Sequence, residues 1–259
     1  MSKLMRSISG IRGIVGDTLT PQVLRSHVSA FLQITGAKRV VIGRDSRPTG
    51  DAISQFVAGI CRLSGVDVVE VGISTTPSVE ILTTELKADA GIIITASHNP
   101  LEWNALKFLN NKGLFLGPDD VKKLFELADA DNFSYPDYRG MGKYEFMKDA
   151  DGVHVDGTLK IPFVDVEAIR AKRFKVAVDA VNGAGSYIVP RLLERLGCEV
   201  VRVHCEPDGT FPRGAEPIPE NLGDLRKAVK DNGCAVGFAV DPDADRCALV
   251  DGLGQSIGE

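Results

Sequence analysis

The chain has 259 residues, a net charge of −5, and 44% hydrophobic against 25% charged residues, which is the composition of a soluble globular protein. This length favours two domains of ordinary size, each with its own core, although one large barrel also fits. The mildly acidic balance and the lack of any apolar run of membrane-spanning length argue against nucleic-acid and membrane partners.

Short β-branched runs alternate with longer amphipathic stretches, and this pattern predicts an α/β fold with mostly parallel sheets. In the first part of the chain we expect strands over 39–43, 67–71 and 90–94, and helices over 51–64 and 119–129. The third strand runs directly into a polar hexapeptide that begins at Thr95.

The same order of elements then repeats. A short helix over 164–172 precedes predicted strands at 175–179, 199–203 and 235–240, with a helix over 185–196. Segment 133–157 is rich in Gly, Asp, Tyr and Pro and lacks a sustained period, so we interpret it as connecting structure. We therefore predict a first domain over 1–150 and a second over 151–259.

Five cysteines are scattered through the sequence, several of them in apolar runs. We interpret all five as buried thiols in a reducing compartment. The first residues lack the apolar stretch of a secretion signal, so a cytoplasmic location is expected.

Ser97 stands in Thr95-Ala96-Ser97-His98-Asn99-Pro100, at the predicted carboxyl end of the third strand, where open α/β sheets bind ligands. Taken alone, this hexapeptide more often forms a local turn in which Ser97 or Asn99 caps the next segment. No G-x-S-x-G elbow is present, so a hydrolase-type serine is not indicated.

Asp241, Asp243 and Asp245 follow the corresponding strand of the second domain. Alternating carboxylates on a looped backbone present hard oxygen ligands to one point, which suits Mg²⁺ better than zinc. An EF-hand is excluded because Arg246 and Gly252 occupy its sixth and twelfth positions. The remaining alternative is a solvated acidic turn.

Several basic residues have weaker signals. Arg12 and the arginines of 43–47, including Arg44, lie on glycine-bounded turns that suit contact with phosphate oxygens. Lys107 could transfer protons if buried, and His98 could contact a phosphoryl group or form a turn hydrogen bond. The glycines of 183–185 match neither nucleotide-binding pattern, so we interpret them as a tight strand-to-helix turn.

Together these residues resemble the α-D-phosphohexomutase family of phosphoglucomutases, phosphomannomutases and phosphoglucosamine mutases. Four stretches match the family in order along nearly the whole chain, and the serine and aspartate loops are the most specific of them. These stretches are 9–13, 95–100 with Lys107, 178–183 and 241–246.

The resemblance implies two consecutive α/β/α domains and a phosphoserine at Ser97. It also implies Mg²⁺ held by Asp241, Asp243, Asp245 and a phosphoryl oxygen on Ser97. The implied catalytic residues are Ser97, Lys107, His98 and Arg12, and the implied phosphate-binding residues are Arg246, Asn99 and Arg44. In the family's reaction the serine phosphoryl group moves to a hexose monophosphate, the resulting bisphosphate turns over, and the other phosphate returns to serine.

Family members have four domains, and this sequence ends after the second, so we expect a fragment that holds Mg²⁺ without turning substrate over alone. Asn104-Ala105 replaces the common Asn-Gly, with no consequence expected for the essential residues. A two-domain binding module and a metal-dependent phosphatase remain alternatives. The residues that select the hexose lie outside the sequence, so glucose, mannose and glucosamine phosphates all stay open.

Overall fold

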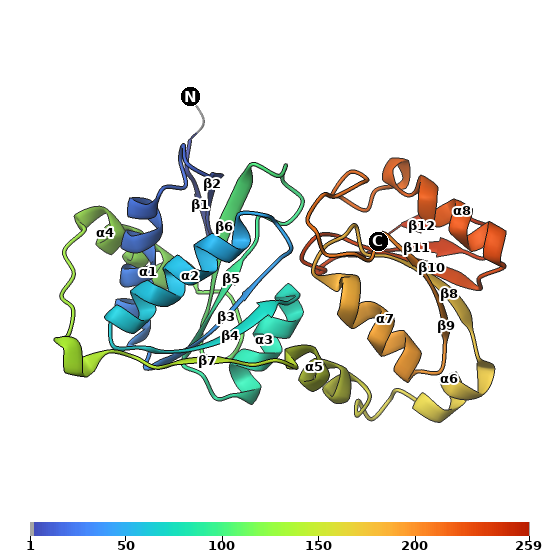
Figure 1. Ribbon diagram of the computed structural model, residues 1–259, viewed down its shortest axis with the longest axis horizontal. Coiled ribbons are helices and arrows are strands. Elements are labelled where there is room, and N and C mark those ends of the chain that lie inside the picture. The colour runs from blue at the N-terminus through green and yellow to red at the C-terminus, as the bar shows by residue number, and fades with distance from the viewer. Residues whose placement is uncertain (1–2, 259) are drawn as a thin grey trace. The chain divides into compact units, whose positions relative to one another are not determined.

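The computed structural model describes residues 3–258. The chain divides into two compact units, Met1–Ala150 (unit 1) and Asp151–Glu259 (unit 2), and each contains its own sheet and covering helices (Figure 1). The expected fold class, two consecutive α/β/α domains with mixed sheets, is confirmed.

Within the described residues, unit 1 forms a seven-stranded sheet in the order β1-β2-β6-β5-β3-β4-β7. Strands β3, β4, β5 and β7 run parallel, whereas β1, β2 and β6 pair antiparallel. Its strands are β1 (Met5–Ser7), β2 (Gly10–Ile14), β3 (Arg39–Arg44), β4 (Asp67–Ile73), β5 (Ala90–Ile94), β6 (Trp103–Leu109) and β7 (Tyr144–Phe146). Its helices are α1 (Pro21–Thr35), α2 (Gly50–Leu63), α3 (Thr76–Glu85), α4 (Pro118–Ala130) and the 3₁₀ turn η1 (Tyr138–Gly140).

The alternation of side chains along the strands builds two cores on the two faces of this sheet. Val40 and Ile42 of β3 pack with α1, α2 and α4 on one face. Gly43 turns toward α3 on the other face, where an added Cβ would meet Val79 at 2.4 Å. Figure 1 shows α3 separated by the strands from the other helices of the unit.

Helices α1 and α3 of unit 1 begin at residues that satisfy free backbone amides. Thr20 accepts a hydrogen bond from the amide of Val23 at the start of α1, and Thr75 does the same for Ser78 in α3. Each cap is followed by a proline within the first turn, where the missing N–H costs no hydrogen bond. Because α3 begins only a few residues after β4, its first residue, Thr76, lies at the carboxyl end of β4, beside the site described below.

Within the described part of unit 2, a five-stranded sheet has the order β12-β11-β10-β8-β9, with β8, β9 and β10 parallel and β11 and β12 antiparallel. Helix α8 covers one face through Leu225 and Val229, and α7 packs on β8 and β9. The strands are β8 (Lys175–Asp179), β9 (Glu199–Val203), β10 (Val236–Val240), β11 (Cys247–Asp251) and β12 (Ser256–Gly258). The helices are α5 (Ala150–Thr158), α6 (Val166–Lys172), α7 (Gly185–Arg195) and α8 (Gly223–Asn232), with the 3₁₀ turn η2 (Pro219–Asn221).

The two sheets contain the same arrangement of four strands. The order β6-β5-β3-β4 in unit 1 corresponds to β11-β10-β8-β9 in unit 2, with the same strand directions. In each unit the third parallel strand turns back through a loop into an antiparallel neighbour. Loop 95–102 makes this turn in unit 1 and loop 241–246 makes it in unit 2, so the predicted repeat of elements is present as a repeat of topology.

Two expectations from the sequence need correction. Segment 133–157 contains η1, β7 and most of α5. The sequence pattern misses them because η1 and β7 have three residues each and because Gly152 and Gly157 lower the helix propensity of α5. The interpretation of all five cysteines as buried is wrong for Cys247, which is exposed in β11, and Cys198 and Cys205 are only partly buried.

Burial does hold for Cys61, and it raises the pKa of that thiol to about 12, which keeps the thiol neutral. Across residues 3–258 none of the helices combines the length and apolar character needed to cross a bilayer.

Candidate active site

Ser97 occupies a strained position in the loop between β5 and β6. Its side chain is nearly buried, with 6% of the residue exposed, and its φ of 50° is in the left-handed region, where non-glycine residues are uncommon and concentrate at functional sites. The Ser97 amide donates to Thr95 Oγ1 at 2.9 Å, and that hydroxyl donates to Asp45 Oδ2 at 2.7 Å. The loop therefore presents one buried hydroxyl in a fixed backbone conformation.

Arg47 fixes the backbone of this loop by hydrogen bonds to its carbonyl groups. Its side chain is fully buried and forms an ion pair with Asp45, with 3.0 Å between Nε and Oδ2. Its two terminal nitrogens donate to four loop carbonyls, those of Ser97, Asn99, Pro100 and Trp103. The expectation that the arginines of 43–47 contact phosphate is therefore wrong for Arg47, because its guanidinium is buried against the loop backbone.

Three residues predicted for the site lie directly around the serine. Arg12 on β2 donates through NH1 to Asn99 Oδ1. His98 is exposed, and its Nδ1 lies 3.4 Å from Ser97 Oγ. The structure thus brings Arg12, His98 and Asn99 together around Ser97 within unit 1.

Lys107 and Arg44 lie toward the same carboxyl edge of the unit 1 sheet. Lys107 on β6 is 5% exposed, and its Nζ is 3.5 Å from Thr76 Oγ1 at the start of α3. Arg44 ends β3, donates to the carbonyl of Asp45 at 3.2 Å, and lies 3.6 Å from Asp51. Its burial and its place at this edge keep Lys107 a candidate for proton transfer.

The second group of predicted residues is the aspartate loop between β10 and β11. The carboxylates of Asp241, Asp243 and Asp245 each offer an oxygen within 4.8 Å of the others, and Asp241 and Asp243 are fully buried. Asp241 Oδ1 accepts hydrogen bonds from the amides of Asp245 and Arg246, and Ala244 takes a left-handed φ of 53° that closes the turn.

These three carboxylates fit a hard divalent cation. Two buried carboxylates and a third within 4.8 Å repel one another strongly in a low-dielectric setting unless positive charge offsets them. An all-oxygen donor set of this kind favours Mg²⁺, Mn²⁺ or Ca²⁺ over zinc or copper. The solvated acidic turn is wrong for Asp241 and Asp243, since both are buried.

Arg246 follows the aspartates and lies between two acidic groups. Its NH1 donates to Glu216 Oε1 at 2.8 Å, and its Nε is 3.5 Å from Asp241 Oδ2. The side chain is 26% exposed, so it is partly accessible to a ligand. Glu216 is a residue of this group that sequence reasoning missed.

The glycines of 183–185 support the aspartate loop from beneath. A Cβ on Gly183 would lie 2.6 Å from the carbonyl oxygen of Pro242, and the amide of Ala184 donates to that oxygen at 2.8 Å. A Cβ on Gly185 already meets Val240 and Ala244. The strand-to-helix turn therefore packs its backbone directly against the aspartate loop, which requires glycine.

Sequence reasoning missed the supporting role of six residues, although one signal for it was visible. The residues are Asp45, Arg47 and Thr95 in unit 1, and Asp179, Arg213 and Glu216 in unit 2. Asp45 and Arg47 are an acidic and a basic residue two positions apart at a strand end, and this pattern could have indicated a buried ion pair. Asp179 and Arg213 are too far apart in sequence for any local pattern.

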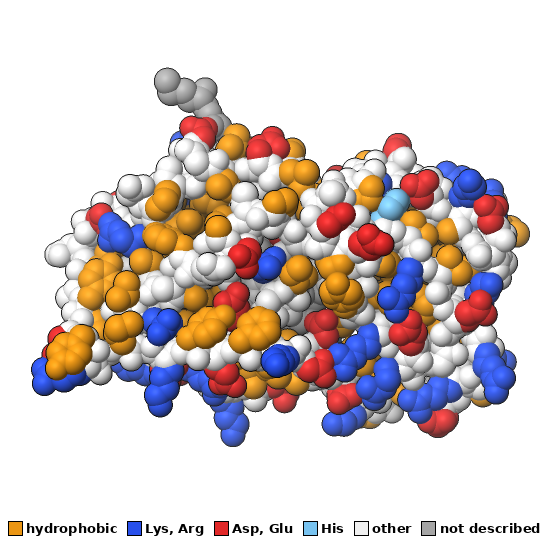
Figure 2. Space-filling view, in the orientation of Figure 1, with side chains coloured by type: hydrophobic (Ala, Val, Ile, Leu, Met, Phe, Trp, Pro, Cys, Tyr) orange, Lys and Arg blue, Asp and Glu red, His pale blue; other side chains and the backbone are white. Residues whose placement is uncertain are grey.

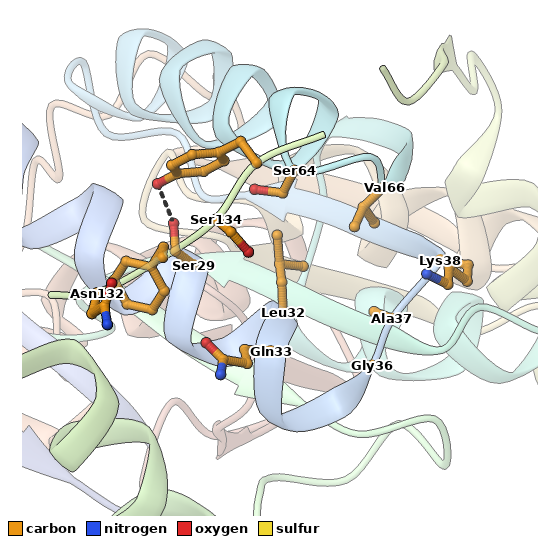
Figure 3. A pocket seen from close by; sticks show the side chains of 12 residues that line it. Ser29, Leu32, Gln33, Gly36, Ala37, Lys38, Ser64, Val66, Asn132 and Ser134 are labelled. Carbon is orange, nitrogen blue, oxygen red and sulfur yellow. Dashed lines mark hydrogen bonds between the residues drawn. The ribbon is translucent and has the colours of Figure 1, made fainter. Parts of the chain in front are cut away.

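A cavity of about 350 Å³ lies elsewhere in unit 1 and contains none of the predicted site residues. Its lining comes from the end of α1 and from the segments that follow α1, α2 and α4 (Figure 3). Ser29 Oγ lies 3.1 Å from the hydroxyl oxygen of Tyr135. Small and neutral polar side chains and one lysine, Lys38, form most of its lining. No carboxylate, histidine or cysteine is among its lining residues.

Charged side chains of both signs alternate on the unit 2 surface in Figure 2, around α6 and α7. Ion pairs such as Arg170 with Glu167 and Arg202 with Glu194 account for this mixture. A one-sign basic field, which nucleic-acid binding uses, is not visible on this face.

Comparison with known proteins gives matches over both units. Residues 4–134 match the family model "Phosphoglucomutase/phosphomannomutase, alpha/beta/alpha domain I", and residues 153–254 match the model for domain II of the same family. The chain is 38% identical over 263 residues to a phosphoglucomutase/phosphomannomutase of Thermococcus kodakarensis, covering 99% of this chain and 57% of that protein. It is 36% identical over 251 residues to a probable phosphoglucosamine mutase of Methanopyrus kandleri, covering 96% of this chain and 54% of that protein.

A solved structure of a putative phosphomannomutase from Thermus thermophilus superposes with a TM-score of 0.84 at 26% identity, covering 99% of this chain and 59% of that one. The chain thus spans little more than half the length of the relatives it matches. With two family models matched in order over residues 4–254, this chain belongs to the phosphoglucomutase/phosphomannomutase family.

Proposed function

We propose that these two units carry the phosphoryl-donating and metal-holding parts of a hexose-phosphate mutase. The observation that carries the proposal is the cluster of three carboxylates, Asp241, Asp243 and Asp245, two of them fully buried, on the loop after β10. Ser97 stands on the topologically equivalent loop of unit 1, and the family to which the chain belongs includes phosphosugar mutases.

In the proposed reaction, the Oγ–P bond of phosphorylated Ser97 breaks as a hydroxyl oxygen of a hexose monophosphate forms a bond to the same phosphorus. The hydroxyl proton passes to a base, for which the buried amine of Lys107 is the proposed group. The second phosphoryl group of the resulting bisphosphate then returns to Ser97 Oγ, and the proton returns to the new hydroxyl of the sugar. Serine and lysine thus end the cycle as they began it.

Charge neutralisation is the other requirement, because phosphoryl transfer depends mainly on positioning and electrostatics. A cation held by Asp241, Asp243 and Asp245, proposed to be Mg²⁺, would offset negative charge on the phosphoryl oxygens, including the one on Ser97. Arg12, Asn99 and His98 surround Ser97 and are proposed to contact the phosphoryl group. Arg44 and Arg246 are proposed as further phosphate ligands.

The proposed substrate is a hexose phosphate. Relatives of similar identity are named phosphoglucosamine mutase and phosphoglucomutase/phosphomannomutase, so glucose, mannose and glucosamine phosphates are all candidates. The free cysteines of the described chain fit a reducing setting, and we propose the cytoplasm.

The test is covalent labelling of Ser97. When the wild-type chain is incubated with Mg²⁺ and glucose 1,6-bisphosphate, we expect the Ser97 peptide to gain the mass of one phosphoryl group. The Ser97→Ala variant should gain none, whereas Ser64→Ala, which removes a hydroxyl at the end of α2, should label like wild type. Labelling of Ser97→Ala to the wild-type extent would contradict the nucleophile assignment.

Product analysis separates the mutase from the phosphatase alternative. A mutase forms an isomeric sugar phosphate with no inorganic phosphate, whereas a phosphatase releases inorganic phosphate. Following the sequence expectation, we propose that the 259-residue chain labels without turning substrate over, and turnover by this chain alone would contradict that part of the proposal. A binding module would bind hexose phosphate and leave Ser97 unmodified.

A further inference from the structure

A buried ion pair lies beneath the aspartate loop of unit 2. Asp179, the last residue of β8, is fully buried, and the side chain of Arg213 is 5% exposed. Arg213 Nε donates to Asp179 Oδ2 at 2.9 Å. Burial of two opposite charges is costly unless their remaining hydrogen-bonding groups are satisfied, so the partners of both groups are informative.

The remaining nitrogens of Arg213 reach backbone carbonyls. NH1 donates to Gly214 at 3.0 Å, and NH2 donates to Val240 at 2.8 Å. Val240 is the last residue of β10, and its carbonyl belongs to the peptide bond that enters Asp241. One planar guanidinium therefore ties the end of β8 to the first residue of the aspartate loop.

Asp179 gives this guanidinium a fixed anchor. Its Oδ1 accepts the amide of Val181 at 2.9 Å, and its Oδ2 lies 3.3 Å from His204 Nδ1 as well as accepting from Arg213. Because the carboxylate is held on both oxygens, its position is set by β8 and the turn that follows. The position of the Arg213 guanidinium is fixed in turn by its ion pair with Asp179.

The orientation of the Val240–Asp241 peptide bears on the whole cluster. The carboxylate of Asp241 accepts the amides of Asp245 and Arg246, so a rotation of the Asp241 backbone would shift the other end of the loop. A change at Arg213 is therefore transmitted to the three carboxylates without any contact with a metal ion.

The same device appears in unit 1. The buried pair of Asp45 and Arg47 ties the end of β3 to the Ser97 loop, and Arg47 donates to the Ser97 carbonyl at 2.7 Å. In both units the acidic partner lies at the end of the first parallel strand and the arginine holds the loop after the third, although Arg47 directly follows β3 and Arg213 comes from the segment after β9. The shared anchor position and the shared target indicate a positioning role for the second pair as for the first.

We propose that Arg213 is a positioning residue for the cation site of Asp241, Asp243 and Asp245. The proposal rests on the proposed metal site and adds a residue that touches neither metal nor substrate. Supporting residues of metal ligands affect metal affinity by roughly ten- to a hundredfold, and we expect an effect at the lower end for Arg213 because it acts through one peptide bond.

The experiment is calorimetric titration of the 259-residue chain with Mn²⁺. Wild type should bind one ion, and Asp243→Asn should abolish that binding. Arg213→Met should weaken the Mn²⁺ affinity by about tenfold. Arg213→Lys keeps a positive charge beside Asp179 but has fewer N–H donors, so its Mn²⁺ affinity should lie between those of wild type and Arg213→Met. Arg226→Met is the matched control and should bind Mn²⁺ like wild type. Arg226 donates to the carbonyl of Gly254, which lies between β11 and β12 near the end of β10 that is opposite the aspartate loop.

Thermal unfolding of each variant, followed by circular dichroism, separates positioning from folding. If Arg213→Met does not fold, Arg213→Lys decides alone: weaker Mn²⁺ binding in a folded variant supports the proposal. Wild-type affinity in the folded Arg213 variants overturns it while leaving the metal site intact. Absence of Mn²⁺ binding in wild type, or binding that Asp243→Asn leaves unchanged, overturns the proposed metal site and this inference together.

Discussion

Arg47 and Arg213 use the same property of the arginine side chain. A guanidinium carries its charge on a planar group with five N–H donors, so it can neutralise a carboxylate and hold several carbonyls simultaneously. Arg47 contacts Asp45 and four carbonyls, and Arg213 contacts Asp179 and two. A lysine cannot reproduce either arrangement.

Replacement of Arg47 by Met should destabilise unit 1. The change leaves Asp45 buried without its cation, and breaking a buried pair in this way costs about 3–5 kcal/mol. The single tryptophan of the sequence, Trp103, lies in β6 of unit 1, so urea unfolding followed by its fluorescence measures this unit. Arg39→Met removes a partly exposed arginine of β3, whose ion pair with Glu145 lies on the surface, and should change the free energy of unfolding by less than about 0.5 kcal/mol. Equal effects of the two substitutions would contradict the structural role of Arg47.

His27 should make unit 1 sensitive to acid. His27 is 1% exposed between α1 and α4. Burial is the largest cause of its lowered pKa, and the charge of Arg6 lowers the pKa further. The hydrogen bond to Val23 and the charge of Asp129 oppose this shift. Because the unfolded chain binds the proton more readily, the free energy of unfolding should fall as pH drops below about 6.5 toward the lowered folded pKa.

The slope that His27 adds is at most about 1.4 kcal/mol per pH unit for one proton. His27→Gln stays neutral throughout, so its free energy of unfolding, measured by Trp103 fluorescence, should fall less between about pH 7.5 and 5.5 than that of wild type. Parallel pH profiles for the two proteins would show that His27 does not titrate during unfolding.

At the scale of elements, the two functional loops depend on close backbone packing as well as on side chains. Gly183 in the turn before α7 has no room for a Cβ, which would lie 2.6 Å from the carbonyl oxygen of Pro242. Gly183→Ala should therefore push the aspartate loop outward and weaken Mn²⁺ binding, by a factor on the order of ten as for other supporting groups.

The matched control for that change is Gly223→Ala, since nothing lies within 4 Å of a Cβ at Gly223 in the first turn of α8. This substitution should keep wild-type Mn²⁺ affinity in the same titration. If both alanine variants bind Mn²⁺ like wild type, the contact between the turn and the loop has no role in shaping the site.

The sequence pattern predicts several of the parallel strands well. The predictions at 90–94, 175–179 and 199–203 coincide with β5, β8 and β9, because continuous apolar or β-branched runs bounded by turn residues have few other stable conformations. The shortest strands are not predicted in the same way. Strands β1, β7 and β12 have three residues each, and so short a strand is defined by its neighbour across the sheet, not by its own pattern.

The candidate site shows the same division. Ser97 and the aspartates stand out because polar groups follow buried strands directly. Their supports do not, because the contact between Asp179 and Arg213 joins residues that are distant in sequence. The three-dimensional fold is needed to show that an arginine with no local motif holds a loop carbonyl.

At the scale of the whole molecule, each unit has its own sheet and core, and the three acidic ligands all belong to unit 2. A cation that binds only the folded state should stabilise unit 2 by about 2.7 kcal/mol at a concentration of about a hundred times Kd. Hydrogen exchange should show slower exchange of β10 amides in Mg²⁺, while the Trp103 unfolding transition of unit 1 should not shift.

Asp243→Asn provides the control, because its exchange rates should not respond to Mg²⁺. A Mg²⁺-dependent shift of the Trp103 transition in wild type, absent from Asp243→Asn, would show instead that the cation site is energetically coupled to unit 1.

Each functional loop joins two neighbouring, hydrogen-bonded strands, β5 to β6 and β10 to β11. The two ends of each loop are therefore held one strand spacing apart, so few of the loop's backbone torsion angles are free to change. The proposed phosphoryl group and cation would meet side chains that are already assembled, so little conformational entropy would be lost on binding. Chemistry on such hairpin loops is expected to proceed by side-chain rotation on a rigid frame, with no folding step in the catalytic cycle.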